Sequence, residues 1–188
     1  LPFALPSDFT IRRMSTFGTN RVKIRTSQHS YGEAYYDEVK TTGNRKYHYS
    51  FGGIELFSTQ DRVSTSTDGS NTVTTTTTDV RDPEGRFIGA VRDVLTASSG
   101  GSKKEVAYTI LEARSEANSN EPVYGTVVVK SGMHSVDDSR INLLEGGTGR
   151  EIADFTQAPP ELSVHLQRDS KIDPRLVLFL GIRAVTRP

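Results

Sequence analysis

Apolar and polar residues alternate along much of the chain with a period of two. The alternation recurs in short stretches at 9–11, 22–24, 47–49, 87–91, 106–110, 127–129 and 162–166. A period of two is typical of strands that bury one face. Turn-forming clusters such as Asp82-Pro83-Glu84-Gly85 separate these stretches. We count about ten to twelve strands, too many for an open sheet, and predict a mainly β sandwich or barrel.

The last segment, residues 174–185, departs from this pattern. It contains a continuous apolar run from Leu176 to Leu180. Asp173 is suited to cap a helix and Pro174 suits a first helical turn. The β-branched residues and the interior Gly181 favour a central strand instead. We favour the helix, and in either form the segment is expected in the middle of a closed β-structure.

Threonine dominates the segment from Ser58 to Thr78, which includes five in succession at 74–78. Because threonine is β-branched, we expect an exposed or edge strand from Asn71 to Val80, entered through a turn at Asp68-Gly69. A solvated hairpin is the simplest interpretation. A ladder of hydroxyl groups that faces a ligand and a segment without fixed structure are the alternatives.

One short pattern occurs twice, as GRFIGAV at 85–91 and GREIADF at 149–155. Both copies follow an acidic turn and open a predicted strand. We expect each glycine to adopt a positive φ in a hairpin. The small residue four positions later is expected to let another element approach closely. The repetition indicates two related hairpins.

These segments, with the strand at 106–113 and the apolar C-terminal segment, resemble the tubby-like superfamily, which includes the phospholipid scramblases and the LURP-one-related proteins of plants. The resemblance covers about residues 79–188. It implies a closed, antiparallel twelve-stranded β-barrel with the hydrophobic C-terminal helix through its centre. The cysteine-rich segment of scramblases is absent and the terminal segment is short, so the resemblance does not extend to lipid translocation.

Composition narrows the function. The 188 residues include 23 basic and 23 acidic residues and no cysteine, which predicts one domain over residues 1–188 without a disulfide framework or a thiolate metal site. The zero net charge argues against nucleic acid as a partner. The opening residues lack the features of a signal peptide and no sequon is present, so we expect a cytoplasmic or peripheral membrane protein, with secretion after removal of a signal peptide as the alternative.

Catalytic motifs are absent. The four histidines are scattered, and none falls in a metal-binding pattern. His134 lies near Asp137 and Asp138 in the sequence. These residues could hold a cation or act as a base, but we interpret them as an exposed acidic loop. We therefore predict no catalytic residues, no cofactor and no metal, and we favour a protein that is not an enzyme.

Basic residues are concentrated in the first 50 residues, which hold eight Lys and Arg against four Asp and Glu. The expected ligand-binding residues are Arg12, Arg13, Arg21, Lys23, Arg25, Arg45 and Lys46. Alternation places the basic residues of 21–25 on one strand face, where Arg and Lys can bind phosphate groups. Because tubby-like domains include phosphoinositide binders, the resemblance implies an anionic phospholipid headgroup as the ligand. A protein partner is the alternative, and the oligomeric state is left open.

Two other functions compete with this binding module. Exposed strands such as the threonine-rich one are suited to pair with another chain in a structural, self-associating protein. A small-ligand barrel enzyme is the other, with a mouth lined by Tyr31, Tyr35, Tyr36, Tyr47, His48 and Tyr49. Aromatic residues on strands also serve as core or cross-strand pairs.

Overall fold

The computed structural model describes residues 6–14, 21–25, 30–41, 44–51, 53–101, 103–114, 122–158, 160–167 and 171–186. For residues 21, 30–41, 44–46 and 51 the description covers the backbone and not the side chains.

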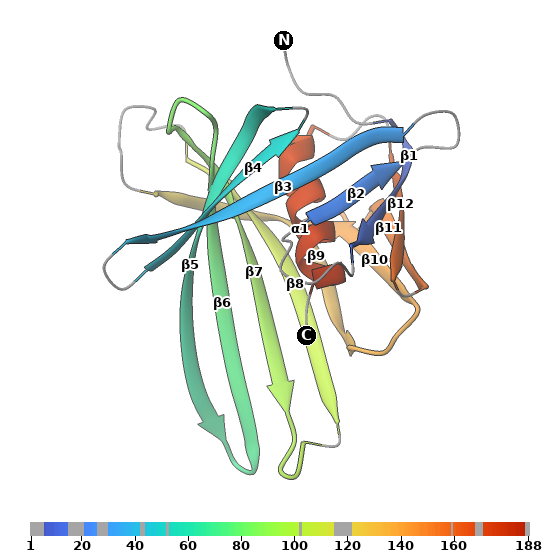
Figure 1. Ribbon diagram of the computed structural model, residues 1–188. Helices are drawn as coiled ribbons and strands as arrows, with labels where there is room; N and C mark the ends of the chain where they lie inside the picture. The colour runs from blue at the N-terminus through green and yellow to red at the C-terminus, as the bar shows by residue number, and fades with distance from the viewer. Residues whose placement is uncertain are drawn as a thin grey trace.

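These ranges contain twelve strands and one helix, so the prediction of a mainly β chain is confirmed (Figure 1). The strands are β1 (Asp8–Arg13), β2 (Arg21–Arg25), β3 (Ser30–Thr41), β4 (Asn44–Phe51), β5 (Ile54–Asp68), β6 (Asn71–Arg81), β7 (Phe87–Ala97), β8 (Lys104–Ala113), β9 (Tyr124–Ser135), β10 (Arg140–Glu145), β11 (Glu151–Ala158) and β12 (Glu161–Leu166). The helix α1 spans Pro174–Thr186.

All strands belong to one antiparallel sheet that wraps around α1 (Figure 1). Each strand pairs with its neighbours in the sequence, and β1 pairs with β12 as well as with β2. Phe9 and Ile11 of β1 alternate with exposed residues and are 3% and 0% exposed. The core therefore lies between the inner face of the sheet and the surface of the helix.

The predicted closed barrel is wrong as a description of this sheet. The hydrogen-bonded order returns from β2 to β1, but β9 and β10 share only two residue pairs, Leu144 with Lys130 and Glu145 with Val129. We call this contact the seam. The strands β5–β8 also continue past α1 as an open extension, which includes residues 63–75, 94–101 and 103–105 (Figure 1). The extension has few large apolar side chains to draw it around a core.

The C-terminal helix is confirmed, and the strand alternative is wrong. The backbone N–H of Arg175 donates to Asp173 Oδ1 at 3.0 Å, which caps the first turn. All residues from Leu176 to Ile182 are buried, as expected for a helix enclosed on every side. A Cβ on Gly181 would lie 2.6 Å from Ile11 Cδ1. This glycine therefore lets β1 approach the helix and does not mark a strand.

The threonine-rich segment forms a central strand and not an edge strand. β6 pairs with β5 along Ser58–Asp68 and with β7 along Phe87–Ala97. Gly69 has φ +61° in the turn that enters it, as the Asp68-Gly69 pair predicts. Thr76, Thr77 and Thr78 are 8% exposed or less. Because β6 is hydrogen-bonded along both of its edges, it has no free edge for another chain, which removes this strand from the self-association hypothesis.

The repeated pattern corresponds to two equivalent hairpins, β6–β7 and β10–β11. Gly85 and Gly149 have φ of +87° and +71°, as predicted. The arginine after each glycine forms an ion pair with the acid that begins the turn, Arg86 with Asp82 at 3.2 Å and Arg150 with Glu145 at 3.3 Å. A Cβ on Gly89 would lie 2.8 Å from Leu176 Cδ1, so the small residue does admit the helix.

Candidate functional site

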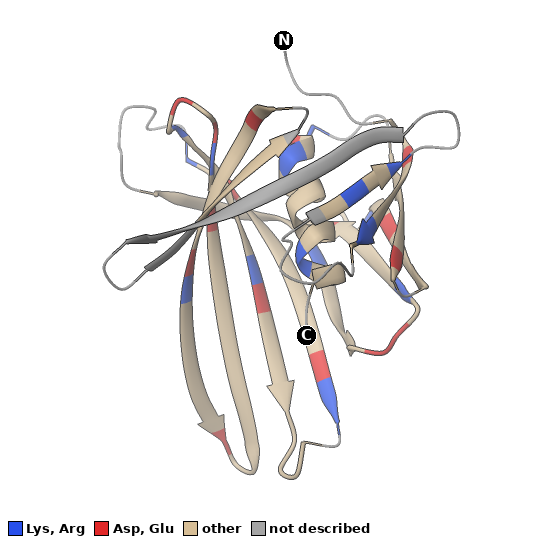
Figure 2. Ribbon diagram, in the orientation of Figure 1, with Lys and Arg blue, Asp and Glu red and all other residues tan. Residues whose placement is uncertain are grey.

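The pairing of β1 with β2 brings three of the predicted ligand-binding residues together. Arg12 lies opposite Lys23, and Arg25 lies opposite Thr10. Their neighbours Ile11, Val22 and Ile24 are at most 1% exposed and point into the core. Since side chains alternate along a strand, Arg12, Lys23 and Arg25 share the outer face. We call these three residues the outer basic cluster, and Figure 2 shows the basic positions on β1 and β2.

Only one member of the outer basic cluster has a carboxylate partner among the described side chains. Arg12 Nη1 lies 3.9 Å from Glu161 Oε1, and both side chains are more than 40% exposed. Such a surface pair contributes little to stability. On the same face of β1, Asp8 Oδ1 forms a hydrogen bond with His165 Nδ1 at 2.7 Å. This hydrogen bond raises the pKa of the His165 imidazole. Among the described side chains, no carboxylate pairs with Lys23 or Arg25, and the backbone register sets Lys23 opposite Glu33 of β3.

The other predicted basic residues do not join this cluster. Arg13 lies opposite the buried Val22 at the end of β1, and its N–H donates to the Pro160 carbonyl at 3.2 Å. The side chain of Arg21 lies outside the described residues, as do those of Arg45 and Lys46. The backbone places Arg45 and Lys46 opposite Lys40 and Val39, whereas β2 pairs with Ser30–Tyr35 of β3. Arg45 and Lys46 therefore lie on β4, beside the half of β3 that does not pair with β2.

The predicted tyrosine-lined mouth is not formed by the described aromatic residues. Tyr49 is 6% exposed and belongs to the core. Its ring stacks on the ring of Phe57, with 4.7 Å between the ring centres. It meets the ring of Phe179 on the helix edge to face, with 5.8 Å between the centres. His48, at the alternate position, forms a contact with Glu55. The side chains of Tyr31, Tyr35 and Tyr36 lie outside the described residues. For Tyr49, the structure supports the core interpretation.

The group around His134 stabilises a turn. His134 Nδ1 is 2.9 Å from the Ser135 carbonyl oxygen, and the Ser135 N–H donates to Asp138 Oδ2 at 3.1 Å. Within the described residues, no group of three or more His, Asp or Glu side chains is placed to hold a metal ion. In the same ranges, no helix has the length and apolar character needed to cross a membrane.

Sequence reasoning missed a polar group inside the sheet, at the last turn of α1. Arg183 forms ion pairs with Asp93 at 3.4 Å and with Asp61 at 3.5 Å. Thr78 donates a hydrogen bond to the same Asp61 at 2.8 Å. These residues occupy inward positions of β5, β6 and β7. The only sequence signal was a charged residue within an apolar helix, and the pairing indicates a structural role.

A second polar group lies on the outer face of β6. Asp79 is 5% exposed and accepts a hydrogen bond from the Tyr124 hydroxyl. Arg62 lies 3.4 Å from the same carboxylate and 5.4 Å from the centre of the Tyr124 ring. Burial raises the pKa of Asp79, and the charges of Arg62 and Arg81 oppose this shift. The group joins β9 to β6 across β7 and β8.

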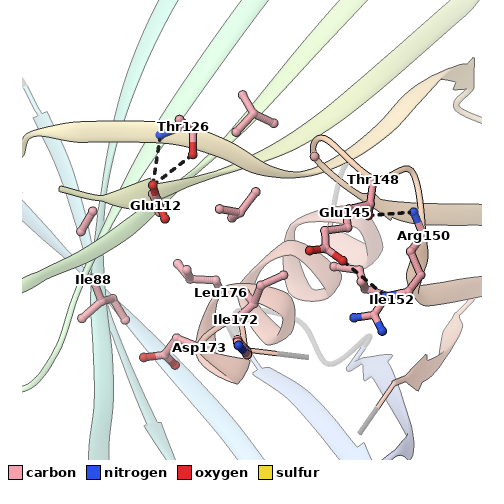
Figure 3. A pocket seen from close by; sticks show the side chains of 15 residues that line it. Ile88, Glu112, Thr126, Glu145, Thr148, Arg150, Ile152, Ile172, Asp173 and Leu176 are labelled. Atoms are coloured by element: carbon pink, nitrogen blue, oxygen red, sulfur yellow. Dashed lines mark hydrogen bonds and ion pairs between the residues drawn. The ribbon is translucent and has the colours of Figure 1, made fainter. Parts of the chain in front are cut away.

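Sequence reasoning also missed a cavity of about 760 Å³ beside the seam (Figure 3). Its lining includes Ile88 and Ile152, which occupy equivalent positions in the two copies of the repeated pattern. It also includes Leu176 from the first turn of α1. The repeat was the sequence signal for this cavity, although only the fold shows that the two isoleucines line one space.

No protein-family model matches the chain, and the searches of curated proteins and of solved structures found no significant match either. The resemblance to tubby-like domains stays a prediction.

Proposed function

We propose that the protein is a non-enzymatic binding module that docks on membranes containing anionic phospholipids through the outer basic cluster. The observation that carries the proposal is the register of β1 and β2, which sets Arg12 opposite Lys23 with Arg25 on the same outer face. Arginine binds phosphate oxygens through paired N–H groups, and lysine adds a compact charge. The resemblance to tubby-like domains points to the same class of ligand.

The base of the cluster is rigid. The buried residues between the basic positions, Ile11 and Ile24, are 0% and 1% exposed and pack in the core. β1 is also paired on its other side with β12 from Asp8 to Arg12. A strand that is held on both edges and from below presents its outward side chains in a fixed arrangement, which lowers the entropy cost of binding.

Vesicle sedimentation tests the proposal. The probes are vesicles of phosphatidylcholine alone and vesicles that also contain phosphatidylserine or a phosphatidylinositol bisphosphate at equal surface charge. Each basic residue near an anionic surface contributes about 1 kcal/mol, so Lys23→Gln/Arg25→Gln should weaken binding about 30-fold. Binding should also fall as added salt screens the charges.

The matched control is Lys103→Gln/Lys104→Gln, which removes the same charge at the hairpin between β7 and β8. Lys103 is exposed and pairs with Glu105 at 3.4 Å. This variant should bind like the wild type. Equal sedimentation with neutral vesicles, or equal loss in both double variants, would overturn the proposal. Absence of binding to every vesicle would also overturn it and leave a protein partner for this face.

A further inference from the structure

The cavity lies where β10 ends and the chain turns into β11, beside residues 126–128 of β9. The turn after β10 closes one wall, where the Gly146 N–H donates to the Val128 carbonyl at 3.0 Å. A Cβ on Gly146 would lie 2.1 Å from the Val127 carbonyl oxygen, so only glycine allows this approach. The first turn of α1, with Leu176, forms another wall. A backbone contact therefore sets one wall of the cavity, and side chains from β7, β8, β9, β11 and α1 complete it.

Much of the lining is apolar and comes from segments far apart in the chain. Ile88, Val128, Ile152, Ile172 and Leu176 all line it. Ile152 and Leu176 are 1% and 3% exposed. Its volume of about 760 Å³ lies within the range of sites that enclose small organic ligands. Burial of a ligand's apolar chain of several carbons against this surface would favour binding, because it removes apolar surface from water.

Most charged groups of the lining are already paired. Glu145 is held by Arg150 at 3.3 Å. Asp173 is held by Arg175 at 2.8 Å and caps the helix as well. Their charges are therefore largely satisfied within the protein, and they leave little attraction for a ligand.

Glu112 differs from these groups. Its Oε1 accepts hydrogen bonds from the Thr126 hydroxyl at 3.0 Å and from the Thr126 N–H at 3.4 Å. Among the described side chains, no cation pairs with Glu112. A Cβ on Gly125 would lie 2.5 Å from Glu112 Cγ, so the glycine makes room for the glutamate. Thr126 thus orients the carboxylate through its Oε1 atom. The Oε2 atom is able to accept a hydrogen bond from a ligand.

The two sides of the cavity differ in charge. Figure 3 shows Glu112 with Thr126 at one side and Arg150 with Glu145 at the other, and the helix with Leu176 lies between them. We propose that this cavity binds a small amphipathic amine, with its apolar body on the isoleucines and its ammonium group on Glu112. An ammonium carries hydrogen-bond donors and a positive charge, which complement an oriented carboxylate. This site is separate from the outer basic cluster.

Lys171 is the competing group. It lines the cavity, is exposed, and has no carboxylate partner among the described side chains. An amphipathic carboxylate could use it. The experiment must therefore compare both headgroups on the same apolar chain.

Nuclear magnetic resonance of isoleucine-labelled protein at pH 7 tests the proposal with three probes: n-octylammonium, octanol and octanoate. We expect n-octylammonium to bind most tightly and to shift the methyl signals of Ile88, Ile152 and Ile172. The signal of Ile54, an isoleucine that is 70% exposed at the start of β5, should not move. A shift confined to Ile54 would mean surface adsorption and would overturn the proposal.

Glu112→Gln removes the charge and keeps an oxygen for Thr126, so this variant should fold. Because Glu112 is exposed, the variant should weaken n-octylammonium binding about threefold, the effect of losing one surface ion pair. It should leave octanol unchanged. The matched control is Glu105→Gln on the same strand, about 23 Å away at the rise of an extended chain. Octanoate binding as tightly as n-octylammonium, an unaffected Glu112→Gln, or no shift with any probe would each overturn the proposal.

Discussion

The part of the sheet around α1 and the open extension of β5–β8 use the same alternating strands but differ on their inner face. Beside the helix the inward residues Val80 and Val91 are 0% exposed. Further along β5 the inward Val63 is 65% exposed, and its partner on β6 is Thr76. The same backbone pairing therefore carries buried apolar side chains beside the helix and an exposed apolar side chain on β5 beyond it.

The boundary between the two regions lies where the helix ends. Arg183, in the last turn of α1, is paired with Asp61 and Asp93 from two strands of the sheet. Up to this point the inner face of the sheet has an apolar partner. Beyond it, the strands depend on their cross-strand hydrogen bonds and side-chain pairs. The length of the helix therefore sets how far the apolar core extends along β5–β7.

The largest test of this comparison removes an aromatic ring from the helix. Phe179 is 2% exposed and contacts Tyr49 and Phe57 edge to face. Phe179→Ala should lower the free energy of unfolding by about 3–5 kcal/mol, measured by urea denaturation. Thr74→Ala in the extension should change it by about 0.5 kcal/mol or less. Similar losses in the two variants would show that the regions do not differ in energy.

A smaller effect is expected at the boundary. Arg183→Met keeps the length of the side chain and removes the cation beside Asp93, whose side chain is 3% exposed. The free energy of unfolding should fall by about 3 kcal/mol at pH 7, because breaking one partner of a buried pair leaves its charge poorly compensated. The double variant Arg183→Met/Asp93→Asn should recover part of this loss. A double variant that is as unstable as the single one would contradict the pairing as the cause.

The smallest effect concerns the outer face at the start of the extension, where Asp79 is buried beneath Tyr124. Burial raises the pKa of Asp79 in the folded state, so the wild type loses stability as the pH rises through that value. Asp79→Asn keeps an oxygen for Tyr124 and removes this dependence. We expect it to be more stable than the wild type at pH 7, by about 1 kcal/mol or less.

The pH profile provides the control for this variant. The stability advantage of Asp79→Asn should disappear when the pH falls below the pKa of an aspartate in the unfolded chain. Both proteins are then uncharged at this position. Urea denaturation at several pH values measures the difference. A wild type that becomes relatively more stable as the pH rises would contradict the direction of the shift.

Local patterns predicted the elements well. Asp173 and Pro174 indicated where α1 begins, and the glycines at 85 and 149 indicated two hairpins with positive φ. The alternation in 22–24 predicted that Lys23 and its basic neighbours lie opposite a buried face, and the burial of Val22 and Ile24 agrees. These features depend on residues close in the sequence, where backbone geometry and side-chain type act directly.

Predictions that needed distant residues to meet were less successful. The closed barrel failed because β9 and β10 keep only two residue pairs and the extension has no helix to wrap. Tyr49 was considered for a ligand mouth and lies against Phe57 and Phe179. No local pattern reveals which aromatic ring meets the helix, because that contact joins residues more than a hundred positions apart.

Side-chain alternation and glycine conformation were enough to predict most strands and the hairpin turns, and the capping residues favoured the C-terminal helix over a strand. The tertiary structure alone decided that Arg12 and Lys23 share a surface, that Ile88 and Ile152 enclose one cavity, and that Arg183 lies between two aspartates. The physical reason is strand register and helix position, which are set by the packing of the whole inner face and not by any one segment.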